Sequence, residues 1–363
     1  TLVETGMTQS KNAVNIAMKN FLDISVGSIT YWLVGYSLMY GDTSNGWFFW
    51  SGLFQGEGAD LFFQTMFAAT AATIVSGAIA GRTKFETYVV FTLIMTAIIY
   101  PISGGWQWQG SGWLTELGFI DFAGSSIVHG VGGFAALVAA YMVGPRMGKY
   151  VDGKVVPIPG HNQILATLGV FILWLGWFGF NGGSQLAMGS FTDAVAVSKI
   201  FINTNLAACG GVLAAAVLTR LMVGKTDVLQ MLNGAIGGLV AITAEPLMPT
   251  PIVAILIGAV GGMIVVWGTK FLFAMQIDDV VGAIPAHLFA GIWGTLAVPM
   301  TNPAANFGTQ LLGIISINVF VFIAAYIIWA IMKNTVGIRL SKEAELKGTD
   351  VTETGVIAYA IRD

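Results

Sequence analysis

The chain has 363 residues, of which 55% are hydrophobic and 10% are charged, and its mean hydropathy is +0.77. A soluble domain carries about 25% charged residues because water must wet its surface, so this composition indicates an integral membrane protein. The net charge of −3 gives no basic field to bind nucleic acid, and the single cysteine excludes internal disulfides and cysteine-built metal sites.

Apolar runs long enough to cross a membrane recur along the whole chain. A helix needs about 20 apolar residues to cross about 30 Å of hydrocarbon. Ten such runs are continuously apolar rather than alternating, which predicts helices and not barrel strands, and the 47 glycines indicate close packing in an all-α polytopic bundle. The expected spans are Val14–Tyr40, Leu61–Ala80, Phe85–Ile102, Ile120–Val143, Gln163–Phe180, Val195–Val223, Val228–Ala244, Ile252–Met275, Ile284–Met300 and Leu311–Met332.

The cationic residues indicate how these spans are oriented. Of the 16 Lys and Arg residues, 14 lie in every second connection or in the tail, while Lys19 and Lys199 lie within apolar runs. This alternation predicts a multi-pass protein of the cell (plasma or inner) membrane with a cytoplasmic C-terminus. The composition becomes charged from Val336, so we expect a transmembrane domain over residues 1–335 and a cytoplasmic tail over residues 336–363.

The sequence opens at Thr1 without an initiator methionine or a signal sequence. Ten crossings would place both ends of the chain inside. We expect the segment through Met7 to be the end of a preceding, truncated helix, in which case the native protein has eleven crossings and an external N-terminus.

One spacing of Asp, Gly, His and Gly occurs twice, five runs apart, so the two copies cross the membrane in opposite directions. This pattern predicts an inverted-topology repeat with its site near the midplane. Each histidine follows its aspartate by eight residues, or about 12 Å of helix, which brings the two imidazoles within about 6 Å of each other in depth. The copies are Asp121, Gly124, His129 and Gly133, and Asp279, Gly282, His287 and Gly291.

Two interpretations of His129 and His287 remain open: core residues that link helices, or the lining of a path through the membrane. Two ionisable residues at related positions inside apolar runs favour a path. We expect no metal site, because two histidines without convergent carboxylate or thiolate partners are a poor ligand set, and we expect no cofactor. His161 lies in a connection and is given no role.

Four motifs, in this order, resemble those of the ammonium transporter (Amt/Mep/Rh) family. The resemblance covers essentially the whole chain. It implies a homotrimer of eleven-helix subunits, each with its own pore, built from two inverted five-helix halves and a final helix, with the first helix largely missing here. The motifs are Phe63-Gln-Thr-Met-Phe67, Asp121-Phe-Ala-Gly-Ser-Ser-Ile-Val-His129, Trp174-Leu-Gly-Trp-Phe-Gly-Phe180-Asn-Gly-Gly-Ser184, and Asp278-Asp279 through His287.

The resemblance also implies an outer cation site formed by Trp108, Phe67 and Ser184. Aromatic faces attract a cation by about 0.5–2 kcal/mol, and the serine hydroxyl accepts one N–H. Trp106 and Trp113 lie close by in the sequence, so an interfacial aromatic belt is the alternative interpretation of this cluster.

Further inward, the resemblance implies a gate of stacked Phe67 and Phe180 and a pore lined by His129 and His287. Asp121 is expected to be a buried carboxylate that supports the architecture and takes part in proton transfer. Moving an intact cation along this path costs several kcal/mol. We therefore expect ammonium to be recruited as a cation, deprotonated near the gate and passed as ammonia, which excludes potassium.

The alternative function is an ammonium sensor that uses the same fold without significant conduction. An enzyme is not expected, because no nucleophile–base pair, phosphate loop or metal cluster is visible in the sequence. For the tail, the resemblance implies packing on the inner face and coupling of neighbouring subunits, and a solvated tail is the alternative. Gly348-Thr349-Asp350 and Gly81-Arg82 depart from the family pattern, which weighs against regulation by a PII-type protein.

Overall fold

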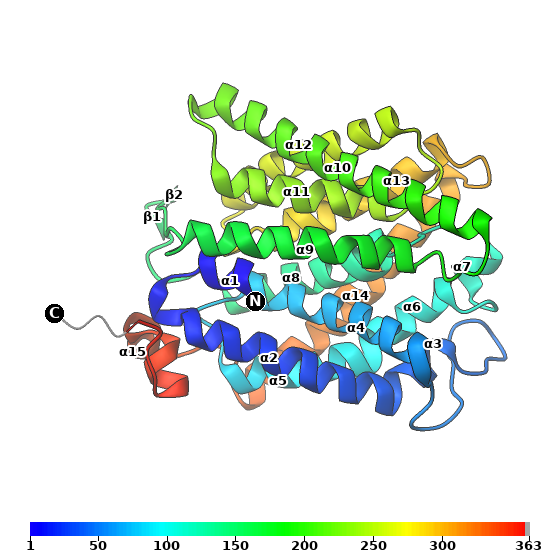
Figure 1. The fold of residues 1–363 in the computed structure, drawn as a ribbon. Helices are drawn as coiled ribbons and strands as arrows, with labels where there is room; N and C mark the ends of the chain where they lie inside the picture. Colours follow the sequence, from blue (N-terminus) through cyan, green and yellow to red (C-terminus); the bar gives the residue numbers. More distant parts are fainter. Residues whose placement is uncertain (360–363) are drawn as a thin grey trace.

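The computed structural model describes residues 1–359, and most of them lie in helices that run roughly along one direction (Figure 1). The bundle therefore has two ends. The tail end carries α15 (Lys342–Lys347) and a hairpin of β1 (Tyr150–Val151) and β2 (Lys154–Val155). The opposite end, called the mouth below, carries α7 (Trp113–Glu116).

Each of the ten predicted runs is helical, and several are interrupted by π-helical or 3-10 turns. Among residues 1–359, seven helices are long and apolar enough to cross a membrane, so the chain is a multi-pass membrane protein. The elements are α1 (Leu2–Met7), η1 (Ser10–Asn12), α2 (Ala13–Thr30), η2 (Tyr31–Gly35), α3 (Tyr36–Tyr40), α4 (Gly58–Ala78), α5 (Phe85–Ile94), η3 (Met95–Ile99), α6 (Tyr100–Trp108), η4 (Ser125–Gly130), α8 (Val131–Val143), α9 (Gln163–Gly183), α10 (Phe191–Val223), α11 (Val228–Thr243), α12 (Pro251–Ala274), η5 (Ile284–Phe289), α13 (Ala290–Ala297), η6 (Val298–Met300), α14 (Phe307–Thr335) and η7 (Asp350–Thr354).

The third run extends further than predicted. The sequence predicted a connection from Ser103, but α6 continues to Trp108. Pro101 directly follows the π-helical turn η3 within one continuous helix, and Gly104 and Gly105 pack against Met39 and Phe49. The small residues of this segment therefore allow close helix packing and do not mark a loop. Because α6 continues this far, Trp108 is the last residue of a helix.

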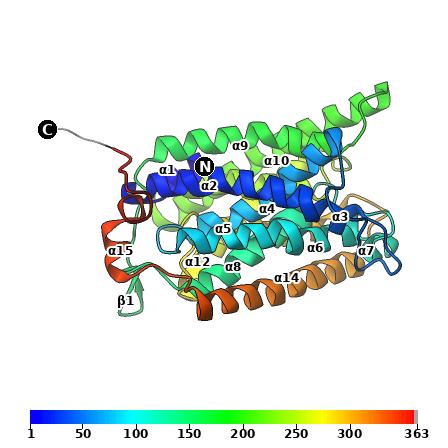
Figure 2. The ribbon, with the colours of Figure 1, turned by 90° about the horizontal axis from the view of Figure 1, so that it is seen from below.

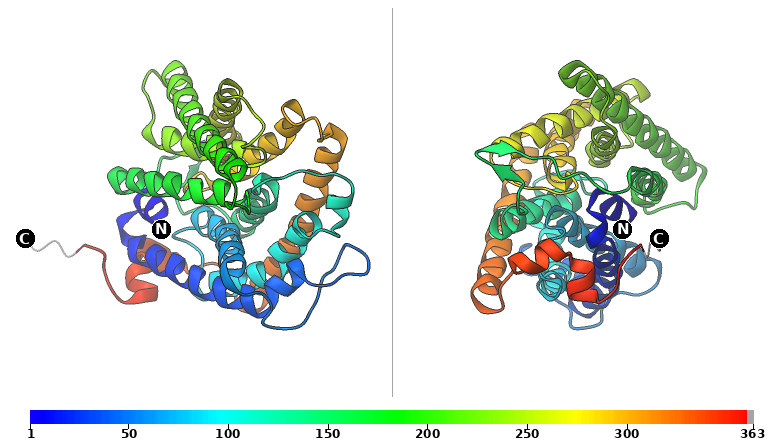
Figure 3. Two further views of the ribbon diagram at one scale, coloured as in Figure 1. Left: turned by 45° about the vertical axis from the view of Figure 1, so that its right-hand side comes forward. Right: turned by 90° about the vertical axis from the view of Figure 1, so that its left-hand side faces the viewer.

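Helices α10, α11 and α12 gather on one side of the bundle, and α2, α4 and α5 on the other (Figures 1 and 3). Glycines let the first three approach closely, since a Cβ at Gly211 would collide with Gly234 and one at Gly258 would collide with Ala207. Helices α9 and α14 run along opposite faces (Figure 2). Both expose apolar side chains such as Ile164 and Ile323, as lipid-facing helices do.

The two Asp–Gly–His–Gly segments cross at the centre of the bundle. A Cβ at Gly133, in the first copy, would collide with the backbone of Leu288 in the second. A Cβ at Gly291, in the second copy, would collide with the backbone of Ser125 in the first. The last glycine of each copy therefore packs directly against the backbone of the other copy's histidine segment.

A buried ion pair joins two connections at the tail end. Arg146 donates through Nε and Nη2 to the two carboxylate oxygens of Asp278, at 2.7 and 2.8 Å, and Asp278 is fully buried. Arg82 donates to the backbone oxygen of Asp278. Burial raises the pKa of Asp278, but the hydrogen bonds of Arg146 and the charges of Arg82 and Arg146 outweigh it and lower this pKa to about 2.

The described part of the C-terminal tail is folded onto its own chain. The Asp350 carboxylate accepts the backbone N–H groups of Val14 and Asn15, at 3.0 and 2.8 Å, and so caps the start of α2. Lys11 Nζ donates to the backbone oxygen of Glu345 at 2.8 Å, and Arg339 pairs with the Glu345 carboxylate at 2.8 Å. This docking differs from the alternative of a tail surrounded by solvent.

Candidate functional site

Asp121 fixes the start of the first histidine segment. Its two carboxylate oxygens accept four backbone N–H groups, those of residues 124 to 127, at 2.8–3.0 Å. Gly124 has a φ of +106°, which favours glycine and turns the chain into η4. The carboxylate is fully occupied by the backbone, so its geometry supports positioning rather than proton transfer.

Asp279 does the same for the second segment. Its carboxylate accepts the backbone N–H groups of Gly282, Ala283 and Ile284 at 2.7–3.1 Å. Gly282 has a φ of +76° at the equivalent turn. Burial raises the pKa of Asp279 to about 6. The repeated spacing therefore corresponds to a repeated local structure: a capping aspartate, a left-handed glycine and a histidine on the turn that follows.

The two histidines meet between these turns. The Nδ1 atoms of His129 and His287 lie 3.1 Å apart, and their ring centroids lie 5.2 Å apart with planes inclined by 27°. Because each neutral imidazole has one donor and one acceptor nitrogen, one Nδ1 donates and the other accepts. His129 is buried, and its Nε2 has no hydrogen-bond partner among residues 1–359. That nitrogen is available to a small molecule beside the pair.

Aromatic rings continue from the histidines toward the mouth. The Phe180 ring lies 5.4 Å from the His129 ring and is stacked on Phe67 at 4.0 Å and 22°. Trp177 stacks on another side of His129 at 5.0 Å. The four rings from Phe67 to His287 thus form a continuous series of side chains without a formal carboxylate or ammonium charge.

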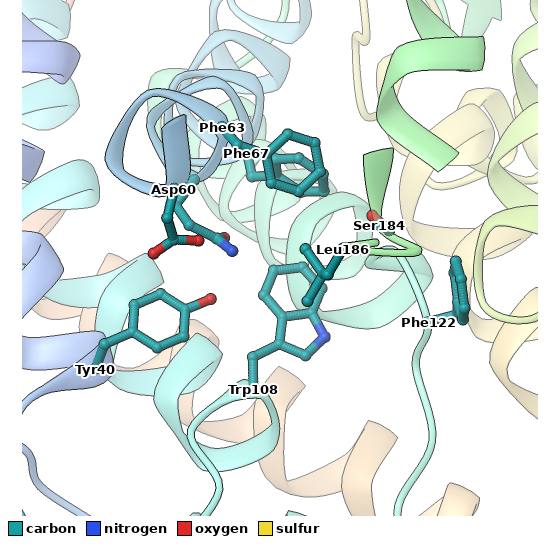
Figure 4. A pocket seen from close by; sticks show the side chains of 9 residues that line it. Tyr40, Asp60, Phe63, Phe67, Trp108, Phe122, Ser184 and Leu186 are labelled. Atoms are coloured by element: carbon teal, nitrogen blue, oxygen red, sulfur yellow. The ribbon is translucent and has the colours of Figure 1, made fainter. Parts of the chain in front are cut away.

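A cavity of about 150 Å³ lies on the mouth side of Phe67. Trp108 borders it, with its ring 5.7 Å from Phe67 in an edge-on arrangement, and its Nε1 donates to the backbone oxygen of Asp121 at 2.9 Å. Ser184 also borders it, and its hydroxyl donates to the Phe180 backbone oxygen at 2.8 Å, which leaves the serine oxygen free to accept (Figure 4). Trp108, Phe67 and Ser184 therefore surround one space.

A second cavity, of about 140 Å³, lies on the opposite side of the ring series. Both histidines border it, together with Asn233, Val281 and the Glu4 carboxylate. Glu4 accepts hydrogen bonds from neutral donors, including Ser76 at 2.8 Å. The histidine pair therefore separates two cavities that approach it from the mouth and from the tail end.

The other two tryptophans near Trp108 lie elsewhere. Trp113 stacks on Trp47 at 4.3 Å, and Trp106 Nε1 donates to the backbone oxygen of Trp47. Neither borders the mouth-side cavity, whereas Trp108 does. Of the sequence-predicted residues, the structure thus brings Trp108, Phe67 and Ser184 together around the mouth-side cavity, with Phe180 stacked on Phe67.

Sequence reasoning did not single out three polar residues that also border the mouth-side cavity: Tyr40, Asp60 and Gln64. It also left out Trp177, which stacks on His129. A signal for two of them was present, because Asp60 and Gln64 precede Phe67 by seven and three residues, which places all three on one face of α4.

Comparisons with known proteins give a consistent result. The model of the Ammonium Transporter Family matches residues 1–359. The chain is 41% identical over 401 residues to the ammonium transporter Amt2 of Archaeoglobus fulgidus, covering 99% of the chain and 84% of that relative. It is 43% identical to a putative ammonium transporter of Synechocystis sp., covering 98% of the chain and 84% of the relative. Among solved structures, a Sensor Amt Protein superposes with a TM-score of 0.93 at 37% identity, over 97% of the chain and 93% of that protein, and Candida albicans Mep2 with 0.84 at 26%, over 94% and 82%.

Proposed function

The chain belongs to the ammonium transporter family, as its motifs predicted, and on this premise we propose that it transports ammonium/ammonia across a membrane. Ammonium is recruited as a cation, gives a proton to water on the mouth side of the gate and passes as ammonia, while the protonated water returns to the solution on that side. One observation carries this proposal: two paired imidazoles, of which buried His129 has a free nitrogen, lie between two cavities and next to a stack of uncharged rings.

Recruitment takes place in the mouth-side cavity. The ring faces of Trp108 and Phe67 attract a cation by about 0.5–2 kcal/mol, and the Ser184 oxygen accepts one of its N–H groups. Several of these contacts act together because they border the same space. They replace part of the hydration that the ion loses when it leaves water.

Passage beyond Phe67 and Phe180 favours a neutral molecule. The stacked pair is apolar, and transferring an intact cation past it into the membrane interior costs several kcal/mol. Ammonia avoids that cost and finds a hydrogen-bonding partner in the free Nε2 of His129. Potassium has no proton to lose, so the same path excludes it. Asp121 serves as a positioning residue, since its carboxylate holds the turn that carries His129.

The proposal also includes the oligomeric state of the protein and its orientation in the membrane. The protein acts as a homotrimer in the cell membrane, surrounded by lipid, with the tail end in the cytoplasm and the mouth outside. The cationic residues of the alternate connections support this orientation. The described tail packs on the start of α2 through Asp350, and its sequence departures weigh against a PII-type partner.

An ammonium sensor is the second candidate function. The observation that favours it is the likeness to a solved protein described as a Sensor Amt Protein, with a TM-score of 0.93. A sensor needs the recruitment site but no conduction, so a transport measurement separates the two functions.

The decisive experiment uses proteoliposomes of the purified protein. Labelled methylammonium uptake is measured against protein-free liposomes, and solid-supported membrane electrophysiology compares ammonium with potassium. A transporter gives saturable uptake that potassium does not support. Saturable binding without uptake would instead identify a sensor, and the absence of both would refute the proposed function.

A further inference from the structure

The mouth-side cavity has a polar wall that the aromatic site does not use. Figure 4 shows Asp60 and Tyr40 on the side of the cavity away from Ser184, with the Tyr40 hydroxyl directed into the space beside Trp108. Gln64 lies on the same face of α4 as Asp60, one helical turn further along, and borders the same cavity. The polar wall, as used below, consists of Tyr40, Asp60 and Gln64.

Gln64 is the first observation that points to a ligand. Its side chain is only 6% exposed, and its Oε1 has no hydrogen-bond partner among residues 1–359. A buried amide oxygen without a donor is unfavourable, and a bound water or ion is one of the explanations for such an atom in a native protein. Here the atom borders a cavity that a small donor can enter.

Asp60 is the second observation. Its carboxylate borders the cavity and accepts a hydrogen bond from the Tyr36 hydroxyl at 2.5 Å. No lysine or arginine in the described part of the chain forms an ion pair with it. The cavity therefore has a fixed negative charge at its entrance, which raises the local concentration of cations.

We propose that Tyr40, Asp60 and Gln64 form a second cation subsite, distinct from the aromatic site, that binds ammonium or a small primary ammonium ion first. This inference rests on the proposed function and deepens it. Ammonium carries four N–H donors, whereas the aromatic site offers ring faces and only one hydroxyl acceptor. The polar wall adds a carboxylate, an amide oxygen and a phenol oxygen, and hydrogen bonds to a carboxylate are about twice as strong as neutral ones.

The subsite also distinguishes between cations by the number of N–H donors that each carries. Ammonium and methylammonium retain three or four N–H groups to satisfy Asp60 and Gln64 together. Tetramethylammonium has none, although ring faces attract it, so it binds at the aromatic site alone. The cavity of about 150 Å³ has room for a small ion at the polar wall, from which the ion moves within the same space to the aromatic site.

The first test is the half-saturating methylammonium concentration for uptake by Asp60→Asn proteoliposomes. We expect it to rise about three- to tenfold, and its dependence on ionic strength to weaken, because one fixed charge is lost. Glu57→Gln, which removes a nearby exposed charge outside the cavity, is the matched control and leaves it unchanged. Tyr36→Phe removes the hydrogen bond to Asp60 but keeps the carboxylate, so an equal rise in that variant would mean that Asp60 acts only by holding Tyr36.

The second test uses Gln64→Met, which replaces the unpaired amide by an apolar side chain of similar size. A purely structural glutamine would lose stability on this change. A binding glutamine gives an unchanged or higher thermal unfolding temperature together with a higher half-saturating concentration. Unchanged half-saturation in both Asp60→Asn and Gln64→Met would overturn the subsite.

Failure of the proposed function is distinguishable from failure of the subsite. If the wild-type protein does not take up methylammonium, ammonium binding to the detergent-solubilised protein is measured by calorimetry instead. Weaker ammonium binding in both variants, with unchanged tetramethylammonium binding, supports the subsite even in a sensor. Equal ammonium binding in wild type and variants refutes it.

Discussion

The Nδ1 atoms of His129 and His287 lie 3.1 Å apart, so the two imidazoles share a single proton between them. Removing both rings removes the hydrogen-bonding groups of the proposed path. We predict that the His129→Ala/His287→Ala double variant takes up methylammonium at least about tenfold more slowly, since a barrier raised by about 1.4 kcal/mol has that effect. His161→Ala, which changes a histidine in a connection, is the control. Full, potassium-excluding uptake by the double variant would contradict the proposed mechanism.

Phe180 stacks on Phe67 at 4.0 Å, whereas its neighbour Phe178 packs against Phe201 away from the ring series. Phe180→Ala opens an apolar gap between the mouth-side cavity and His129. We predict that this variant admits hydrated ions, so a potassium current appears in solid-supported membrane recordings. Phe178→Ala removes a ring of the same size on the same helix and retains selectivity. A Phe180→Ala protein that still rejects potassium would show that the phenyl stack is not the barrier to ions.

Trp108 borders the mouth-side cavity, and Trp113 stacks on Trp47 outside it. Trp108→Leu removes one cation-attracting face worth about 0.5–2 kcal/mol, so we predict a rise of about two- to thirtyfold in the half-saturating methylammonium concentration. Trp113→Leu leaves this concentration unchanged while lowering the thermal unfolding temperature. Equal effects of the two variants would favour the interfacial belt over a cation site.

Asp278 contributes to stability in a definite pH range. Its pKa in the folded protein is about 2, below the ordinary value of 3.8, so its contribution is present above pH 3.8 and is lost as the pH falls toward 2. The shift corresponds to about 2.5 kcal/mol. We predict that thermal unfolding in detergent shows this acid loss in wild type and less of it in Asp278→Asn, which is already less stable at pH 7 because Arg146 loses its partner.

Asp152→Asn is the control for that measurement, since Asp152 lies exposed in the turn between β1 and β2. It should keep the wild-type acid profile. An Asp278→Asn profile parallel to that of wild type would mean that other carboxylates cause the acid loss.

Much of the fold could be predicted because the membrane restricts the choice of structure. Continuous apolar runs that cross a membrane must be helices. The segments from Asp121 to His129 and from Asp279 to His287 share one local structure: an aspartate cap, a left-handed glycine and a turn that bears the histidine. The extension of α6 to Trp108 was missed because Gly104 and Gly105 have no apolar side chain to mark burial, although both pack tightly.

The polar wall of the mouth-side cavity escaped sequence analysis for a different reason. An aspartate in the first turn of a helix is common, because it complements the helix dipole, so Asp60 in α4 has an ordinary structural explanation. Tyr40 comes from a different segment, and nothing in the sequence indicates that it faces Trp108. Only the folded arrangement brings these residues together.

His129 and His287 both lie on π-helical turns, in η4 and η5. A π turn contains one residue more than an α turn, so each histidine segment holds one residue more than an α-helical segment with the same number of turns. Deleting one residue, such as Ile127, would restore the α-helical repeat and rotate the preceding residues by about 100° relative to those that follow. The relative orientation of the two imidazole rings therefore depends on the number of residues in each segment. The fold of these segments should tolerate substitutions better than the insertion or deletion of one residue.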